Sequence, residues 1–178
     1  MIRSSLVPVL LLAGVLAAGC GTSEPDAVAP QVSAAADANL VLQPASSKPL
    51  VVLKGLVNGG RPLRADLSSF DALPTQTLTV IEPFVKTSMT FEGVGFGDLL
   101  SAAKATGTSL TVHAADDYEV TFDAAMLRSE GALLATHVDG KPIEVRSGGP
   151  VRMIFPASSK AGEDTDLWVW SVDQILVE

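Results

Sequence analysis

The sequence predicts an α+β domain in which a mixed β-sheet is combined with short helices. Short apolar runs recur along residues 49–178, and most end at Gly, Pro, Asn or Asp, as strands do. Only three segments in this range have the spacing of amphipathic helices, and all three are short. Many short strands with three short helices between them are typical of this fold class.

The first predicted strand covers residues 50–56 and ends in an Asn-Gly-Gly turn at 58–60. Asp66 follows and has the chemistry of a helix N-cap, since its carboxylate can accept hydrogen bonds from the first free N–H groups. We therefore expect a short helix from Asp66 that ends at Pro74.

Residues 77–85 alternate threonine with apolar side chains and predict a second strand. Pro83 within it indicates a sheet edge or a bulge, because proline cannot donate to a strand ladder. Residues 91–96 contain two glycines and predict a turn, which leads into a helix over 97–106.

The following region predicts a strand over 110–114 and a return strand over 118–122. Asp123 is placed to cap another short helix. A hairpin is then predicted from strands over 132–138 and 142–145, since an Asp-Gly pair between them favours a two-residue turn.

Residues 148–156, GGPVRMIFP, combine a sharp turn with a strand that carries Arg152 toward the core. Arg152 shares a strand face with Ile154, so its charge needs an acceptor or a route to water. One interpretation is an arginine that snorkels or pairs with a structural carboxylate. The other is an anion-binding arginine beside a glycine-rich turn. The chain closes with strands predicted over 167–172 and 174–177.

Residues 1–19 resemble a bacterial lipoprotein signal peptide: a positive charge precedes a short apolar run, and small residues stand ahead of Cys20. The resemblance implies that the Cys20 thiol is acylated and anchors the chain to a membrane. Residues 20–48, rich in Ala, Ser, Pro and Asp, predict a flexible tether to a domain over 49–178. The expected location is the bacterial cell envelope, on the periplasmic face of the outer membrane in a Gram-negative cell.

The net charge limits the partners. The formal charge is −8, and removal of residues 1–19, which contain Arg3 and no acid, makes it −9. This acidic balance argues against nucleic acid or anionic lipid as a partner. Because Cys20 is the only cysteine, no disulfide forms within the chain, and the apolar core alone must hold the fold.

Five segments together resemble the oxidoreductase molybdopterin-binding domain family, whose members include sulfite oxidases. The segments stand in the family's order at compatible spacing, and they are FEGVGFGDLL at 91–100, HAADDYEVTF at 113–122, LLATHVDGKPI at 133–143, GGPVRMIFP at 148–156 and LWVWSVDQILV at 167–177. The resemblance implies a mixed α+β fold and a pocket that holds a molybdenum pterin between loops of the sheet.

The chain departs from the family at the expected metal ligand. The family holds molybdenum through a cysteine thiolate in the region that matches 77–90, and this region has no cysteine. Glu82 or Ser88 offers only oxygen there, a hard donor in place of a soft one. Where the family often has Asp-Gly-Tyr, this chain has Asp116-Asp117-Tyr118, whose extra carboxylate would repel a phosphate. We therefore expect no cofactor, with molybdopterin as the alternative that the resemblance allows.

These observations favour a lipid-anchored binding or interaction module with a molybdopterin-oxidoreductase-like domain and no catalysis. The expected ligand is a small anion or a loop of an envelope protein. The alternatives are a molybdopterin-dependent oxidoreductase with atypical ligation and a purely structural envelope lipoprotein. The candidate pocket residues are Asp117, Tyr118, Arg146, Gly149, Arg152 and Lys160.

Overall fold

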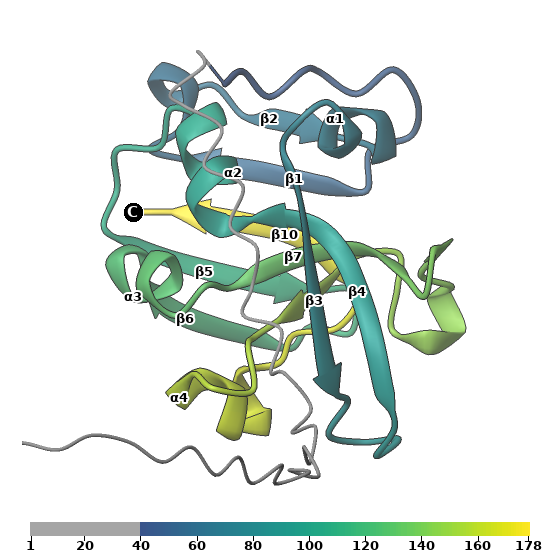
Figure 1. Cartoon of the computed structure of the whole chain (residues 1–178). Helices are drawn as coiled ribbons and strands as arrows, with labels where there is room; N and C mark the ends of the chain where they lie inside the picture. Colours follow the sequence, from purple (N-terminus) through teal and green to yellow (C-terminus); the bar gives the residue numbers. More distant parts are fainter. Residues whose placement is uncertain (1–39) are drawn as a thin grey trace, which may run out of the picture.

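The computed structural model describes residues 40–178, which form two five-stranded sheets with short helices around them (Figure 1). This architecture confirms the predicted α+β class, although the strands divide between two sheets. The predicted signal peptide, Cys20 and most of the predicted tether lie outside the described residues.

The first sheet is mixed and has the strand order β2-β1-β10-β5-β6. The C-terminal strand β10 lies in its middle, parallel to β1 and antiparallel to β5. The bounds are β1 Val51–Gly55, β2 Leu63–Ala65, β5 Ser109–Ala114, β6 Glu119–Asp123 and β10 Val172–Val177.

The second sheet is antiparallel, with β4 between β3 and β7. Strand β7 also pairs with β8 and with β9, which contains Arg152. The bounds are β3 Thr75–Ile81, β4 Ser88–Gly95, β7 Leu133–Val138, β8 Lys141–Pro142 and β9 Arg152–Ile154.

The helices are all short. The α-helices are α1 Leu67–Asp71, α2 Phe96–Ala102, α3 Ala124–Ser129 and α4 Lys160–Glu163, and the 3₁₀ turns are η1 Asn58–Gly60, η2 Val145–Ser147 and η3 Thr165–Leu167. Asp66 and Asp123 cap α1 and α3, as the sequence predicted. Within residues 40–178, no helix has the length and apolar character needed to cross a membrane.

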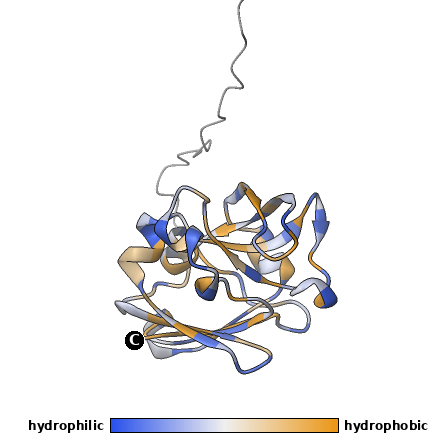
Figure 2. Cartoon of the chain, turned by 90° about the horizontal axis from the view of Figure 1, so that it is seen from below, coloured by the Kyte–Doolittle hydropathy of each residue, from blue (hydrophilic) through white to orange (hydrophobic). Residues whose placement is uncertain are grey.

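One apolar core lies between the sheets and helices. Strand β5 shows how the sequence builds it, since Leu110, Val112 and Ala114 are buried and the residues between them are half-buried. Figure 2 shows the same alternation of apolar and polar residues along the strands. The largest fully buried side chains include Phe70, Phe91, Phe96 and Phe155, so aromatic rings fill much of the interior.

Several sequence-based boundaries were wrong. The strand predicted over 142–145 is only β8 Lys141–Pro142, and Val145 already belongs to η2. The strand predicted over 77–85 ends at Ile81, and a tight turn over 82–87 follows it. The turn predicted over 91–96 is the end of β4, where Gly93 allows β4 to lie against the backbone of β7. Residues 167–171 are not a strand, because the 3₁₀ turn η3 and an irregular segment precede β10, which begins at Val172.

Residues 40–48, which the sequence places in the tether, contact the folded domain. Leu42 is only 3% exposed, and its N–H donates to the carbonyl of Ala102. The backbone N–H groups of Ser46 and Ser47 each donate to the Asp66 carboxylate at 2.8 Å. Any free tether therefore ends before Leu42.

We expect Asp66→Asn to lower the thermal midpoint by roughly 5–10 °C. The hydroxyl of Ser68, followed by the hydroxyl and N–H of Ser47 and the hydroxyl of Ser69, holds the pKa of Asp66 far below its ordinary value. A lowered folded-state pKa contributes stability above the unfolded value of about 4, and this contribution is lost as the pH falls. Calorimetry at pH 7 and pH 3 tests this, and a difference between wild type and variant that does not shrink at pH 3 would contradict it.

Candidate functional site

Three loops meet at a cleft with a volume of about 360 Å³. They are the turn over 82–87, the β5–β6 turn and the segment that follows α4. We call this the aromatic cleft. Its lining residues are Phe84, Ala114, Asp116, Tyr118, Thr165, Asp166, Trp168 and Trp170. Two regions singled out in the sequence therefore meet at this cleft. One is the region 77–90, where the family resemblance places the metal ligand, and the other is the Asp116-Asp117-Tyr118 motif.

The aromatic cleft contains all the tryptophan and tyrosine of the chain. The sequence has two Trp and one Tyr, and all three line this one cavity. Phe84 joins them, and its ring lies edge-on to that of Trp170 with 4.9 Å between centroids. Phe84 is 55% exposed and Tyr118 is 44% exposed, so these two residues leave the cleft open to solvent.

The charged groups that line the cleft are both acidic. Asp116 and Asp166 are exposed carboxylates, and no Lys or Arg is among the lining residues. The Tyr118 hydroxyl donates to the backbone carbonyl of Asp166 at 2.6 Å. This bond ties the β5–β6 turn to the segment after α4 and fixes two of the three loops relative to each other.

The third loop is fixed by a buried ion pair. Arg152 on β9 donates from Nη2 to Glu82 Oε1 at 2.7 Å, and the side chains are 5% and 1% exposed. The other Glu82 oxygen accepts the N–H groups of Phe84 and Val85 at 2.8 and 2.7 Å. Glu82 therefore shapes the turn that presents Phe84 to the cleft.

Opposing effects act on the pKa of each partner. Burial raises the pKa of Glu82, but the N–H of Val85 and the charge and N–H of Arg152 outweigh it, so the net pKa is lowered. Burial lowers the pKa of the Arg152 guanidinium, and Glu82 opposes that change. Because an arginine side chain stays protonated at neutral pH, Arg152 and Glu82 form an ion pair there.

Arg152 also contacts a residue of the aromatic cleft, Trp170. Its guanidinium carbon lies 4.1 Å from the centroid of the Trp170 ring and 5.3 Å from that of Phe91. Gly148 lies against the same Trp170 ring, where a Cβ would come within 2.7 Å of a ring carbon. The glycine-proline turn singled out in the sequence therefore supports Trp170. The sequence allowed two interpretations of Arg152, a structural arginine paired with a carboxylate or an anion-binding arginine. The structure shows the first, because Arg152 pairs with Glu82.

Three buried donors have no acceptor among the described residues: the indole N–H groups of Trp168 and Trp170 and the Arg152 Nε. A buried donor without a partner costs about 1–3 kcal/mol. Such donors are uncommon in folded proteins, and here all three belong to residues that line or support the aromatic cleft.

The six candidate residues from the sequence do not share one cavity. Tyr118 lines the aromatic cleft and Asp117 is its neighbour in the turn. Arg146 forms an ion pair with Glu144 at the surface. Lys160 is the exposed first residue of α4. Gly149 is buried and joined to Pro150 by a cis peptide bond.

Sequence reasoning did not place Phe84, Asp166, Trp168 or Trp170 among the candidate pocket residues. The composition did hold a signal for this site. The chain has only two Trp and one Tyr, and all three lie within segments that resemble the family. The two tryptophans lie two residues apart at the start of the family-like segment at 167–177.

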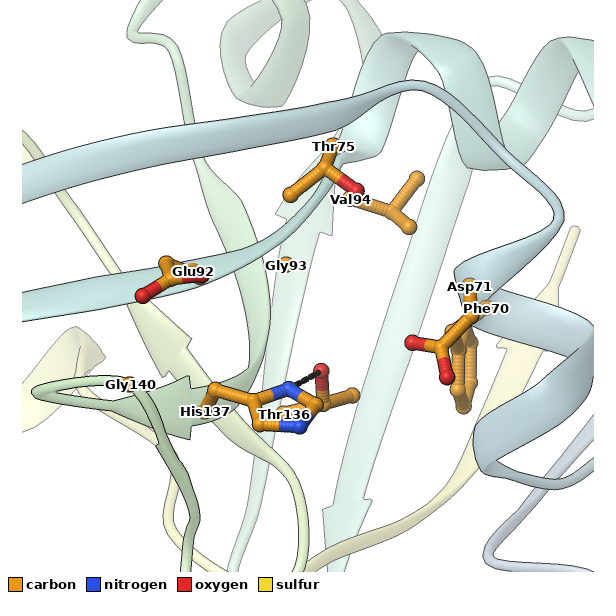
Figure 3. Close-up of a pocket in the computed structure, with 9 residues that line it drawn as sticks. All are labelled: Phe70, Asp71, Thr75, Glu92, Gly93, Val94, Thr136, His137 and Gly140. Atoms are coloured by element: carbon orange, nitrogen blue, oxygen red, sulfur yellow. Dashed lines mark hydrogen bonds between the residues drawn. The ribbon is translucent and has the colours of Figure 1, made fainter.

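A second cleft of about 270 Å³ lies between α1 and strands β4 and β7. Figure 3 shows His137 bonded to Thr136, with the Asp71 carboxylate on the other side of the cavity. The Thr136 Oγ1 to His137 Nδ1 distance is 3.0 Å. The only Phe, Tyr or Trp that lines this second cleft is Phe70, which is 1% exposed. The second cleft therefore offers mainly polar side chains and backbone.

Within residues 40–178, no cluster of three or more His, Cys, Asp or Glu side chains has a geometry that could hold a metal ion. The same range contains no cysteine.

Comparison with known proteins gives one family and one fold. Residues 57–163 match the family described as oxidoreductase molybdopterin binding domain. Among solved structures, the chain is similar to the sulfane dehydrogenase SoxCD from Paracoccus pantotrophus, with a TM-score of 0.57 and 19% identity. The match covers 71% of this chain and 37% of that chain, which supports the fold alone. No curated protein sequence matches the chain.

Proposed function

Because the chain belongs to the oxidoreductase molybdopterin-binding domain family, we propose that it is a ligand-binding member of that family that has lost molybdenum catalysis. The observation that carries this proposal is the composition of the aromatic cleft, whose lining includes residues of the family-like segments 113–122 and 167–177. There the chain supplies aromatic rings and carboxylates in place of a thiol and basic side chains.

The residues of the cleft do not fit a molybdenum pterin. A soft thiolate ligand is missing, since the only cysteine of the chain is Cys20. The Glu82 carboxylate is occupied by Arg152 and by two backbone N–H groups. A cofactor phosphate would meet Asp116 and Asp166 without a lining cation to balance it. The same carboxylates disfavour the small anionic ligand that the sequence suggested.

We propose further that the domain is held at the cell envelope through an acylated Cys20. The support is the signal-like sequence of residues 1–19 and the tether-like composition that follows it. Two acyl chains would give an anchor that does not leave the membrane on a biological timescale. The domain would then meet its ligand at the membrane surface.

The proposed loss of catalysis is tested by elemental analysis and pterin extraction on the full-length chain, purified in detergent from a host that makes molybdenum cofactor. We expect less than about 0.05 molybdenum per chain, a level that excludes a stoichiometric metal. A molybdoenzyme purified from the same host serves as the positive control. Stoichiometric molybdenum with released pterin would overturn the proposal.

The anchor is tested by growing the same host with an alkyne-tagged fatty acid. We expect label on the wild-type chain and none on Cys20→Ser, because only the thiol can form the thioether. Equal labelling of both chains, or of neither, would contradict acylation at Cys20.

A further inference from the structure

We infer that the aromatic cleft binds a small organic cation with alkyl groups on its nitrogen. This inference rests on the proposed function, since it takes the cleft to be a ligand site without a pterin. It names the chemical class that the aromatic rings and carboxylates select.

The aromatic rings come from all three loops of the cleft. Phe84, Tyr118, Trp168 and Trp170 together line a cavity of about 360 Å³. This volume falls within the range of small-molecule sites. The negative face of an aromatic ring attracts a cation, and sites built from several rings recognise alkylated ammonium groups. A fully hydrated inorganic ion would gain little from such walls.

The charge of the cleft has the matching sign. Asp116 and Asp166 add two negative charges to the lining, and no lining side chain is basic. Arg152 does not reverse this balance, because Glu82 pairs with it inside the core. The chain itself already places one cation over Trp170, since the Arg152 guanidinium lies 4.1 Å from that ring.

The cleft is organised before any ligand arrives. The Tyr118 hydroxyl holds the Asp166 backbone, and Glu82 holds the turn of Phe84. Little loop ordering would therefore oppose binding.

The experiment compares choline with 3,3-dimethylbutan-1-ol, which has the same shape and a hydroxyl but no charge. Because both tryptophans of the chain line the cleft, intrinsic tryptophan fluorescence of the full-length protein in detergent reports on this site alone. We expect choline to bind at least about 10-fold more tightly than the neutral alcohol, measured against sodium chloride at equal ionic strength. Saturation-transfer NMR on the methyl protons detects binding that leaves the fluorescence unchanged.

Two variants separate this site from general charge effects. Asp166→Asn removes a cleft carboxylate whose side chain makes no hydrogen bond among the described residues, and it should weaken choline binding about 3- to 10-fold. Asp71→Asn removes a carboxylate from the second cleft and should leave choline binding unchanged. Thermal midpoints of both variants confirm that they fold.

Equal affinity for choline and the neutral alcohol, or no binding of either, would overturn the inference. An equal loss in both variants would also overturn it. These outcomes leave the proposed function intact, because molybdenum content is measured separately. Stoichiometric molybdenum would overturn the proposed function and this inference together.

Discussion

Replacing Glu82 with Gln is expected to lower the free energy of unfolding by about 3–5 kcal/mol, because the change leaves a buried arginine without its counter-ion. Gln keeps the size of the side chain and an oxygen that can accept the Phe84 and Val85 N–H groups. The variant therefore removes mainly the charge. Urea unfolding followed by circular dichroism measures the difference.

The matched control replaces both partners by apolar side chains, Glu82→Leu with Arg152→Met. Removing both charges of a buried pair is often neutral or stabilising, so we expect the double variant to recover most of the loss. The Phe84 and Val85 N–H groups lie in an exposed turn where water can replace the carboxylate. A double variant as unstable as the single one would contradict the expectation that the uncompensated charge of Arg152 causes the loss.

The pH dependence of this pair has a defined sign. The folded-state pKa of Glu82 is lowered, so its contribution is present above the unfolded value of about 4 and is lost as the pH falls. The stability difference between wild type and Glu82→Gln should therefore shrink below pH 4. A difference that stays constant down to pH 3 would contradict the ion-pair explanation.

Much of the fold could be predicted from local chemistry. Asp66 and Asp123 were recognised as helix caps because the capping carboxylate and the N–H groups that donate to it are neighbours in sequence. The Asp139-Gly140 hairpin turn was found for the same reason. The division of the strands between two sheets was not predicted, because strand pairing depends on contacts between distant residues.

The candidate site was harder to predict. Arg152 was recognised as a charge that needs a partner, but its partner lies 70 residues away at Glu82, and no local pattern connects the two. The sequence identified Tyr118 through the family motif. Phe84 was hidden because residues 77–85 look like one strand, and only the turn at 82–87 brings that ring into the cleft.

Replacing Gly93 with Ala is expected to destabilise the protein by about 3 kcal/mol or more. A Cβ at this position would overlap the carbonyl oxygen of Leu134 on β7 and crowd the backbone of Ala135. Backbone cannot move aside as a side-chain end can, so β4 and β7 would have to separate at the centre of the second sheet. Denaturant unfolding of the purified variant measures the loss.

Gly95→Ala is the matched control on the same strand. Its Cβ would meet only the end of the Gln76 side chain, at 2.5 Å, and that flexible amide can turn away. The cost should stay below about 1 kcal/mol, the order of the Gln76–Asp98 hydrogen bond that would be lost. Propensity alone makes Ala better than Gly within a strand, so it predicts that both variants are stabilised. Only the close approach of β7 to Gly93 predicts a large loss for Gly93→Ala and a small one for Gly95→Ala, and equal stability of the two variants would show that this approach is not as close as described.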